Sequence, residues 1–266
     1  IRSLMKKKIL YLLTCVGLCW SSCTNEVDEF IGNVEPSTRS VSTALNANLA
    51  SLFTGGAPTL TSAEIKEVND AYAKMTSINC YRNIDEAVRN KTSYAGTIFL
   101  DDTYASAYFR KGSLAFPPYG ILASSMEHEF IHMYQRDVQG KKVDTDKEKR
   151  DTGMMEFELA FYQGIIRYIH AGYSWTFKGE DGDPSYQSLW TSGLTDPSLI
   201  PQYEREFQTY VASICANGKP TSIDINEFVK WSNIFGEYSR GYSGKGYKFG
   251  NYDYGTSCIN SLLKLY

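Results

Sequence analysis

Apolar and polar residues follow one another along this chain in patterns that predict strands early and helices late. Thr61-Ser62-Ala63-Glu64 reads as a capping box at the start of a helix. Residues 94–100 and 107–116 have the composition of short strands, the second broken near Gly112. Helical periodicity is found at 84–89, 121–136, 153–170, 198–215, 225–238 and 257–265. This order predicts an α+β fold, with a small mixed or antiparallel sheet packed on a helix and a mostly helical C-terminal part from about residue 171.

The first 23 residues follow a different pattern. Three lysines at 6–8 precede an apolar run at 9–20, which is shorter than the roughly 20 residues that span a bilayer. Residues 1–22 are therefore predicted to be a signal peptide. The run ends in Trp20-Ser21-Ser22-Cys23, which resembles the lipobox of bacterial lipoproteins. That resemblance implies lipidation of Cys23, with an ordinary cleaved secretory signal as the alternative.

A lipidated Cys23 would anchor the protein outside the cytoplasm, at the outer membrane, on its periplasmic or cell-surface side. Residues 23–48 are acidic at first and then rich in Ser, Thr and Asn, as in a flexible tether between membrane and domain. Acidic residues directly after the cysteine resemble the surface-export signal of some Gram-negative lipoproteins. A linker without signal value has the same composition, so both interpretations stay open.

Composition and charge narrow the class of protein. The chain has 266 residues, of which 42% are hydrophobic, enough for a sizeable core. Its formal net charge of −3 becomes −7 once the four basic residues among the first 22, where no acid occurs, are removed. An acidic domain without a basic block is a poor candidate for binding nucleic acid.

The cysteines give limited information. Outside the leader the chain has Cys80, Cys215 and Cys258, which allow at most one disulfide and leave one free thiol. The pairing stays open, as does the oligomeric state. No C-x-x-C pair occurs, so a zinc site built on cysteines is not predicted.

The most informative motif is His128-Glu129-Phe130-Ile131-His132, within the predicted helix 121–136. Positions i and i+4 share one face of a helix, so both imidazoles can bind the same metal ion. Glu129 lies close enough to act on a water molecule without being a ligand. Chance would produce roughly 0.002 such matches in a chain with so few histidines. The motif therefore predicts a Zn²⁺ site with His128 and His132 as ligands and Glu129 as general base.

A third protein ligand has to come from elsewhere in the chain. The extended metzincin pattern fails, because Gln135 and Val138 stand at its Gly and His positions. Residues 128–135 (HEFIHMYQ) and 155–163 (MEFELAFYQ) together resemble gluzincin-type metallopeptidases. In that family a glutamate on a second helix completes the site. The resemblance spans about 94–167 and implies a zincin-like metallopeptidase domain, which we place at residues 49–266.

Two glutamates on the second helix compete for this role. Glu156 and Glu158 lie about 200° apart around the helix axis. Glu156 is nearer to the small residues Gly153, Ala160 and Gly164, which suit close approach by another helix. The family pattern also favours Glu156, which we predict as the third ligand. Glu158 lies on the most apolar face, where it is an alternative ligand or a partner of a ligand histidine.

Weaker signals concern the rest of the site. Gluzincins often add a Tyr or His that donates to the oxyanion. Residues 238–254, the Gly/Tyr-rich segment, offer candidates among which the sequence does not choose: Tyr242, Tyr247, Tyr252 and Tyr254. His170, at the end of the second helix, is expected to interact with the helix terminus rather than with a metal.

These signals predict a zinc-dependent metallopeptidase that hydrolyses peptide bonds of a peptide or protein substrate. Zinc acidifies a water molecule, and Glu129 takes its proton and later returns it to the leaving amine. The competing class is a surface lipoprotein that binds a glycan or protein through its aromatic residues, which make up 14% of the chain, with a structural or vestigial metal.

Overall fold

The structure, a computed structural model, describes residues 44–141, 149–170, 194–250 and 257–266. The predicted signal peptide, Cys23 and the tether up to residue 43 lie outside this range. The helices are α2 (Ala47–Leu52), α3 (Ser62–Ser77), α4 (Asn79–Lys91), α5 (Ala123–Met133), α6 (Lys149–His170), α7 (Ile200–Ile214), α8 (Ile225–Tyr238) and α9 (Ser257–Leu263). The strands are β1 (Ile98–Leu100), β2 (Tyr108–Arg110), β3 (Ser113–Phe116), β4 (Cys215–Ala216) and β5 (Lys219–Pro220).

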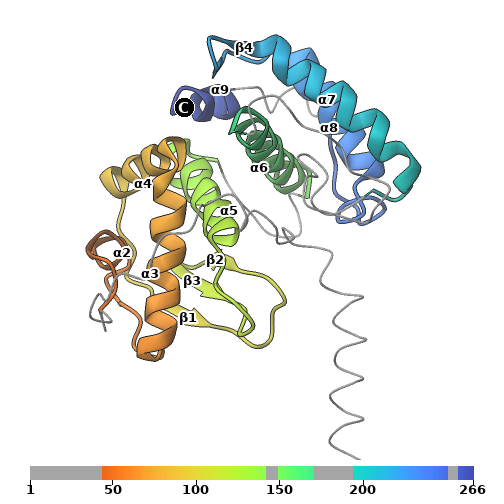
Figure 1. The fold of residues 1–266 in the computed structure, drawn as a ribbon. Coiled ribbons are helices and arrows are strands. Elements are labelled where there is room, and N and C mark those ends of the chain that lie inside the picture. The colour runs from red at the N-terminus through yellow and green to blue at the C-terminus, as the bar shows by residue number, and fades with distance from the viewer. Residues whose placement is uncertain (1–43, 142–148, 171–193, 251–256) are drawn as a thin grey trace, which may run out of the picture.

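The predicted class, a mostly helical α+β fold with a small sheet, is confirmed (Figure 1). Strands β1 to β3 and helices α2 to α5 form one side of the molecule, and α7 and α8 the other, with α6 between them. Among the described helices, none is both long enough and apolar enough to cross a membrane.

The N-terminal helices follow their local sequence closely. Thr61 and Glu64 form the predicted capping box, since Glu64 Oε2 accepts from the Thr61 amide at 2.7 Å and Thr61 Oγ1 accepts from the Glu64 amide at 3.3 Å. Helix α4 is longer than the predicted 84–89, because the buried residues Cys80, Ile84 and Val88 extend its apolar stripe at four-residue spacing. Helix α2 was not predicted, and it begins two residues before the expected domain start at 49.

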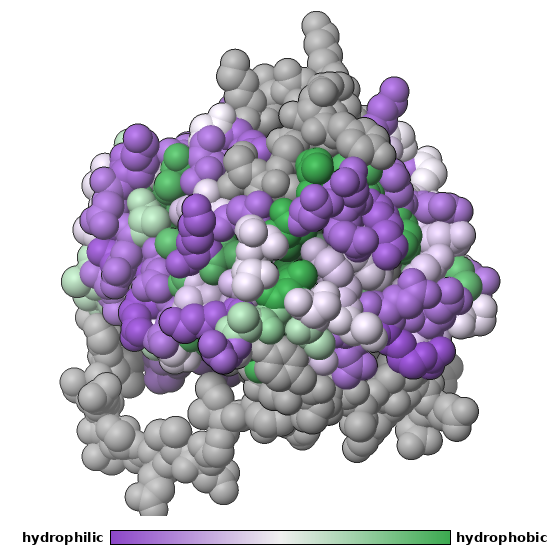
Figure 2. Space-filling model, turned by 90° about the horizontal axis from the view of Figure 1, so that it is seen from above, coloured by the Kyte–Doolittle hydropathy of each residue, from purple (hydrophilic) through white to green (hydrophobic). Residues whose placement is uncertain are grey.

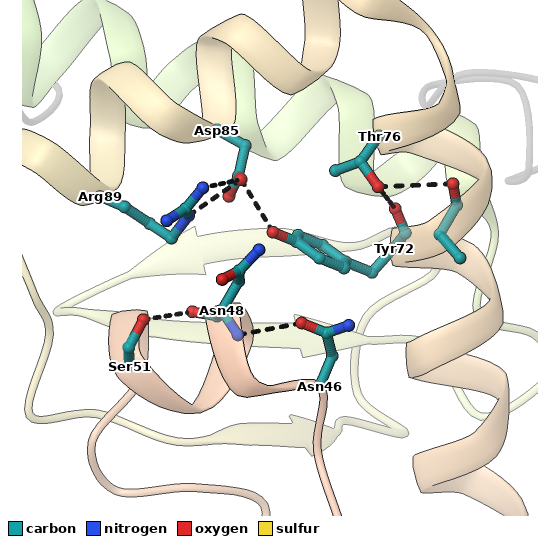
Figure 3. A network of polar contacts seen from close by, with 8 residues as sticks. Asn46, Asn48, Ser51, Tyr72, Thr76, Asp85 and Arg89 are labelled. Carbon is teal, nitrogen blue, oxygen red and sulfur yellow. Dashed lines mark hydrogen bonds and ion pairs between the residues drawn. The ribbon is translucent and has the colours of Figure 1, made fainter.

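A buried polar network joins these helices (Figure 3). Asp85 of α4 is only 1% exposed, and its Oδ2 accepts from the Tyr72 hydroxyl of α3 at 2.8 Å and from Arg89 Nε at 2.9 Å. The side chain of Asn48, on α2, points toward the same group. Since a buried carboxyl group is stable only with such partners, the network fixes how α2, α3 and α4 pack together.

The first sheet is mixed, one of the two arrangements left open by the sequence, with strand order β1-β3-β2. Strand β3 pairs in parallel with β1 and antiparallel with β2, so β2 forms one edge. Lys111 and Gly112 turn the chain between β2 and β3 with positive φ angles of 51° and 77°. The expected strand from Tyr94 starts only at Ile98, because Tyr94 donates its amide to Leu52 at the end of α2 instead.

Helix α6 is the centre of the core. It contacts α5 on one side and α7, α8 and α9 on the other. Phe157, Phe161 and Phe228 form an aromatic cluster with rings 5.0–5.8 Å apart, joining α6 to α8. The described side chains of α6 are buried on nearly all faces, which is typical of a helix in the middle of a domain. Seen from the top of Figure 1, the outer surface is mostly hydrophilic, with a narrow hydrophobic strip near its centre (Figure 2).

Two local features were not predicted. The helix expected over 121–136 ends at Met133 and continues as a π-helix, Tyr134–Val138, whose Gln139 amide donates to the Tyr134 carbonyl at 3.0 Å. The hairpin of β4 and β5 turns at Asn217 and Gly218, both with positive φ. An Asn-Gly pair suits this turn, although strands of two residues give too little alternation to predict.

Candidate metal centre

Helix α5 presents the two histidines of the H-E-x-x-H motif toward α6. Its buried residues, among them Met126, Phe130 and Met133, hold the helix in the core. His128 and His132 lie one turn apart, and their Nε2 atoms approach to 3.1 Å with ring planes at 82°. Both rings are half-buried. The spacing of the motif thus brings two nitrogen ligands to one point, as helix geometry requires.

Glu156 of α6 completes a group of three possible ligands. Its Oε1 lies 3.3 Å from His132 Nε2, and its Oε2 lies 3.7 Å from His128 Nε2. All three ligand atoms lie within 4.8 Å of one another, and no second group of three such residues is found in the part of the chain that the structure describes. This arrangement is compatible with a zinc site.

The electrostatics of the three residues favour a positive charge between them. Burial acts to raise the pKa of Glu156, but the two histidines outweigh it and lower the pKa to about 2. Burial acts to lower the pKa of His132, yet Glu156 raises it to about 9. Burial and the charge on His132 lower the pKa of His128. Without a metal, His132 binds a proton and so supplies the positive charge that a cation would otherwise supply.

Glu129 lies beside this group, at the boundary with the sheet. It is 5% exposed, and burial raises its pKa although His128 and His132 act to lower it. The backbone amide of Phe109, on the edge strand β2, also interacts with its carboxyl group. A carboxyl group with a raised pKa, held next to possible metal ligands, has the properties of a general base.

Among the described residues of the Gly/Tyr-rich segment, Tyr242 reaches the site. Its hydroxyl donates to Glu156 Oε2 at 3.0 Å, and its ring packs on Phe235 of α8 at 5.0 Å. Tyr247 contacts the ring of Tyr242, while Tyr252 and Tyr254 lie outside the described residues. The sequence could not choose among these tyrosines, because the choice depends on how the segment packs against α6 and α8.

Glycines make that packing possible. A Cβ atom on Gly153 of α6 would lie 3.0 Å from the Lys248 carbonyl oxygen, and one on Gly236 of α8 would lie 2.2 Å from Phe249. The small-residue stripe of α6 was expected to receive another helix. At Gly153 it receives an irregular segment instead, and this segment carries Tyr242 toward Glu156.

Glu158 is not one of the three possible ligands and contacts Gln135 instead. It is fully buried, and its Oε2 accepts from Gln135 Nε2 at 2.7 Å. Gln135 Oε1 in turn lies 2.8 Å from His132 Nδ1. Glu158 is therefore linked to a histidine of the motif through Gln135. In the sequence Gln135 stands out only as a departure from the metzincin pattern, because its contacts to His132 and Glu158 depend on tertiary packing.

Other residues considered in the sequence lie elsewhere. No disulfide joins Cys80, Cys215 and Cys258, so the one possible disulfide is not formed. Helix α6 ends at His170, but the side chain of His170 is outside the described part of the structure.

Comparison with known proteins gave no match. No protein-family model fits the chain, and neither a curated protein nor a solved structure is significantly similar to it.

Proposed function

We propose that this protein is a zinc-dependent metallopeptidase of gluzincin type, with His128, His132 and Glu156 as ligands and Glu129 as general base. The observation that carries the proposal is the spacing of the three ligand atoms. A tetrahedral zinc ion with bonds of about 2.0–2.2 Å separates its ligand atoms by about 3.3–3.6 Å. The two Nε2 atoms lie 3.1 Å apart, and Glu156 approaches His132 through Oε1 at 3.3 Å and His128 through Oε2 at 3.7 Å, all close to this range.

The donor set supports zinc in particular. Two imidazoles and one carboxylate are the ligands of His₂Glu catalytic sites, which leave a fourth position open to water and substrate. Bound zinc supplies Lewis acidity, which acidifies water and polarises a carbonyl group. A purely structural site has no need of a buried carboxyl group such as Glu129 beside it.

The protein's own residues have separate roles in this proposal. Glu129 accepts a proton from the attacking water at its carboxylate, for which its raised pKa makes it a stronger base, and it then passes that proton to the leaving amine. Tyr242 holds Glu156 through its hydroxyl in the substrate-free protein, and it is the candidate donor to the oxyanion if its single proton turns from Glu156 to the substrate. Both residues lie within contact of the ligand group, as these roles require.

The substrate in this proposal is an extended peptide or protein segment. Strand β2 is at the edge of the sheet, and the Phe109 amide on it interacts with Glu129. A peptide that pairs with β2 would therefore place a scissile bond near the general base. The arrangement of sheet, motif helix and second ligand helix supports a zincin-like domain.

The location in this proposal follows from the leader. A signal peptide over 1–22 and lipidation at Cys23 would place the enzyme outside the cytoplasm on a membrane. A zinc peptidase at that place would act on exported or extracellular polypeptides.

The test compares the wild-type protein with Glu129→Ala on an unselective protein substrate, with and without a chelator. We expect the wild type to contain zinc and to lose cleavage when it is chelated. Glu129→Ala should keep its zinc but cleave at least about 100-fold more slowly. Zinc binding without any cleavage would favour the binding lipoprotein instead, and equal cleavage by the two proteins would contradict the role of Glu129.

A further inference from the structure

We propose that Gln135 is a positioning residue that fixes which ring nitrogen of His132 faces the metal. This inference rests on the proposed zinc site. It concerns a buried amide that lies outside both the H-E-x-x-H motif and the ligand set. Gln135 is fully buried, and both ends of its amide group have partners.

The partners determine the orientation of the amide. Gln135 lies 3.0 Å from the Met155 carbonyl oxygen, which can only accept a hydrogen bond. The amide atom there must therefore be the nitrogen, which also donates to Glu158. The amide oxygen then faces His132 and can only accept. His132 Nδ1 must consequently carry a hydrogen, which leaves the lone pair of Nε2 for a metal.

The π-helix explains how Gln135 reaches three partners. Gln135 is the second residue of this π-helix, Tyr134–Val138, and follows the two histidines in the chain. The wider turn places its side chain toward both His132, three residues earlier, and the first half of α6. Single π turns are frequent at functional sites, and here the turn provides a contact between the motif helix and the helix of the third ligand.

Glu158 makes the amide difficult to rotate. It projects from α6 and is also in contact with Cys258 of α9, since burial and the Glu158 carboxyl group raise the pKa of the Cys258 thiol. The amide is thus held by groups of α6, one of which is itself packed against α9. Partners behind ligand histidines orient the ring, and their loss typically lowers metal affinity by about 10- to 100-fold.

The main experiment measures zinc affinity by chelator competition for Gln135→Met, which keeps the shape of the side chain but removes its polar atoms. We expect a loss of about 10- to 100-fold. The matched control is Gln163→Met, which alters another buried glutamine that lies on α6 itself and has no hydrogen bond to the histidines, and should change affinity less than threefold. Thermal unfolding of the metal-free proteins separates lost stability from lost affinity. Equal affinities for wild type and Gln135→Met would overturn the proposal.

A second measurement needs no variant. Nitrogen-15 NMR of the zinc-loaded wild type should show His132 bound through Nε2, with a slowly exchanging proton on Nδ1. Coordination through Nδ1 would contradict the inference even if Gln135→Met fails to fold. Wild-type protein that binds no zinc at this site would instead contradict the proposed function.

Discussion

The Tyr242 hydroxyl donates a 3.0 Å hydrogen bond to Glu156, a residue 86 positions earlier in the chain. The contact connects the C-terminal Gly/Tyr-rich segment to the candidate metal centre. It uses one carboxylate oxygen and leaves Glu156 Oε1 directed at His132. A segment that carries no motif thus takes part in ordering the site.

Removal of this hydroxyl tests its contribution. Tyr242→Phe should weaken zinc binding by about tenfold, because a hydrogen bond to a charged group is worth about 1.5–3 kcal/mol and the ring is retained. Tyr210→Phe is the control. Tyr210 lies on α7, and its hydroxyl is buried without a hydrogen-bond partner. An affinity unchanged in Tyr242→Phe, measured by competition with a chelator, would show that Glu156 needs no support.

The two glutamates of α6 should differ in their effect on the metal. Glu156→Gln removes a proposed ligand and should lower zinc affinity by more than about 100-fold, beyond the usual effect of losing an outer partner. Glu158→Gln keeps an oxygen that can accept from Gln135 and should lose no more than about tenfold. The reverse order in the two titrations would make Glu158 the ligand.

The ion pair of His132 and Glu156 should give the metal-free protein a characteristic dependence on pH. Glu156, with its pKa lowered from 4.5 to about 2, stabilises the fold above about pH 4.5 and loses this effect as the pH falls through 2. His132, with its pKa raised from 6.5 to about 9, stabilises below about pH 6.5 and loses this effect as the pH rises through 9.

The difference in Tm between metal-free wild type and Glu156→Gln should therefore be largest between about pH 4.5 and 6.5. It should shrink toward pH 9 as His132 loses its proton. A difference that grows on going from pH 6.5 to 9 would contradict the pairing.

The polar network of the N-terminal helices should matter for stability rather than for catalysis. Asp85→Ala leaves the Tyr72 hydroxyl and Arg89 without their shared acceptor and should lower the free energy of unfolding by about 2–3 kcal/mol. Asp70→Ala breaks a second i,i+4 pair, with Lys66, that is more than half exposed, and should have an effect of about 0.5 kcal/mol or less. If Asp85→Ala and Asp70→Ala lowered the free energy of unfolding equally in denaturant titrations, burial of Asp85 would add nothing to the stability of the fold.

Lipidation is tested in the living cell. Cys23→Ala should move the protein from the membrane fraction to a soluble fraction and should abolish labelling by a fatty-acid analogue. Unchanged labelling would place the lipid at another residue, and a wild type without label would favour the ordinary secretory signal.

Local rules predicted much of the fold. The capping box at Thr61, the helix of the motif and the presence of a small sheet all depend on residues that are close in sequence. The convergence of His128 and His132 follows from the helical repeat alone. These features needed no knowledge of tertiary packing.

The remaining features depend on tertiary contacts. Helix periodicity favoured Glu156 over Glu158 only weakly, since the choice depends on the rotation of α6 against α5. Tyr242 reaches the site because glycines at 153 and 236 allow its segment to approach. The π turn that places Gln135 has no sequence signature comparable to a cap or a hairpin turn.

The central claim is that His128, His132 and Glu156 hold one zinc ion. Anomalous diffraction at the zinc absorption edge, from crystals of the zinc-loaded protein, tests it most directly. We predict a single strong peak between the three side chains, with bonds of about 2.0–2.2 Å to both Nε2 atoms and to a Glu156 oxygen. Absence of a peak at this position in the zinc-loaded crystals, or a peak bound by other residues, would contradict the account.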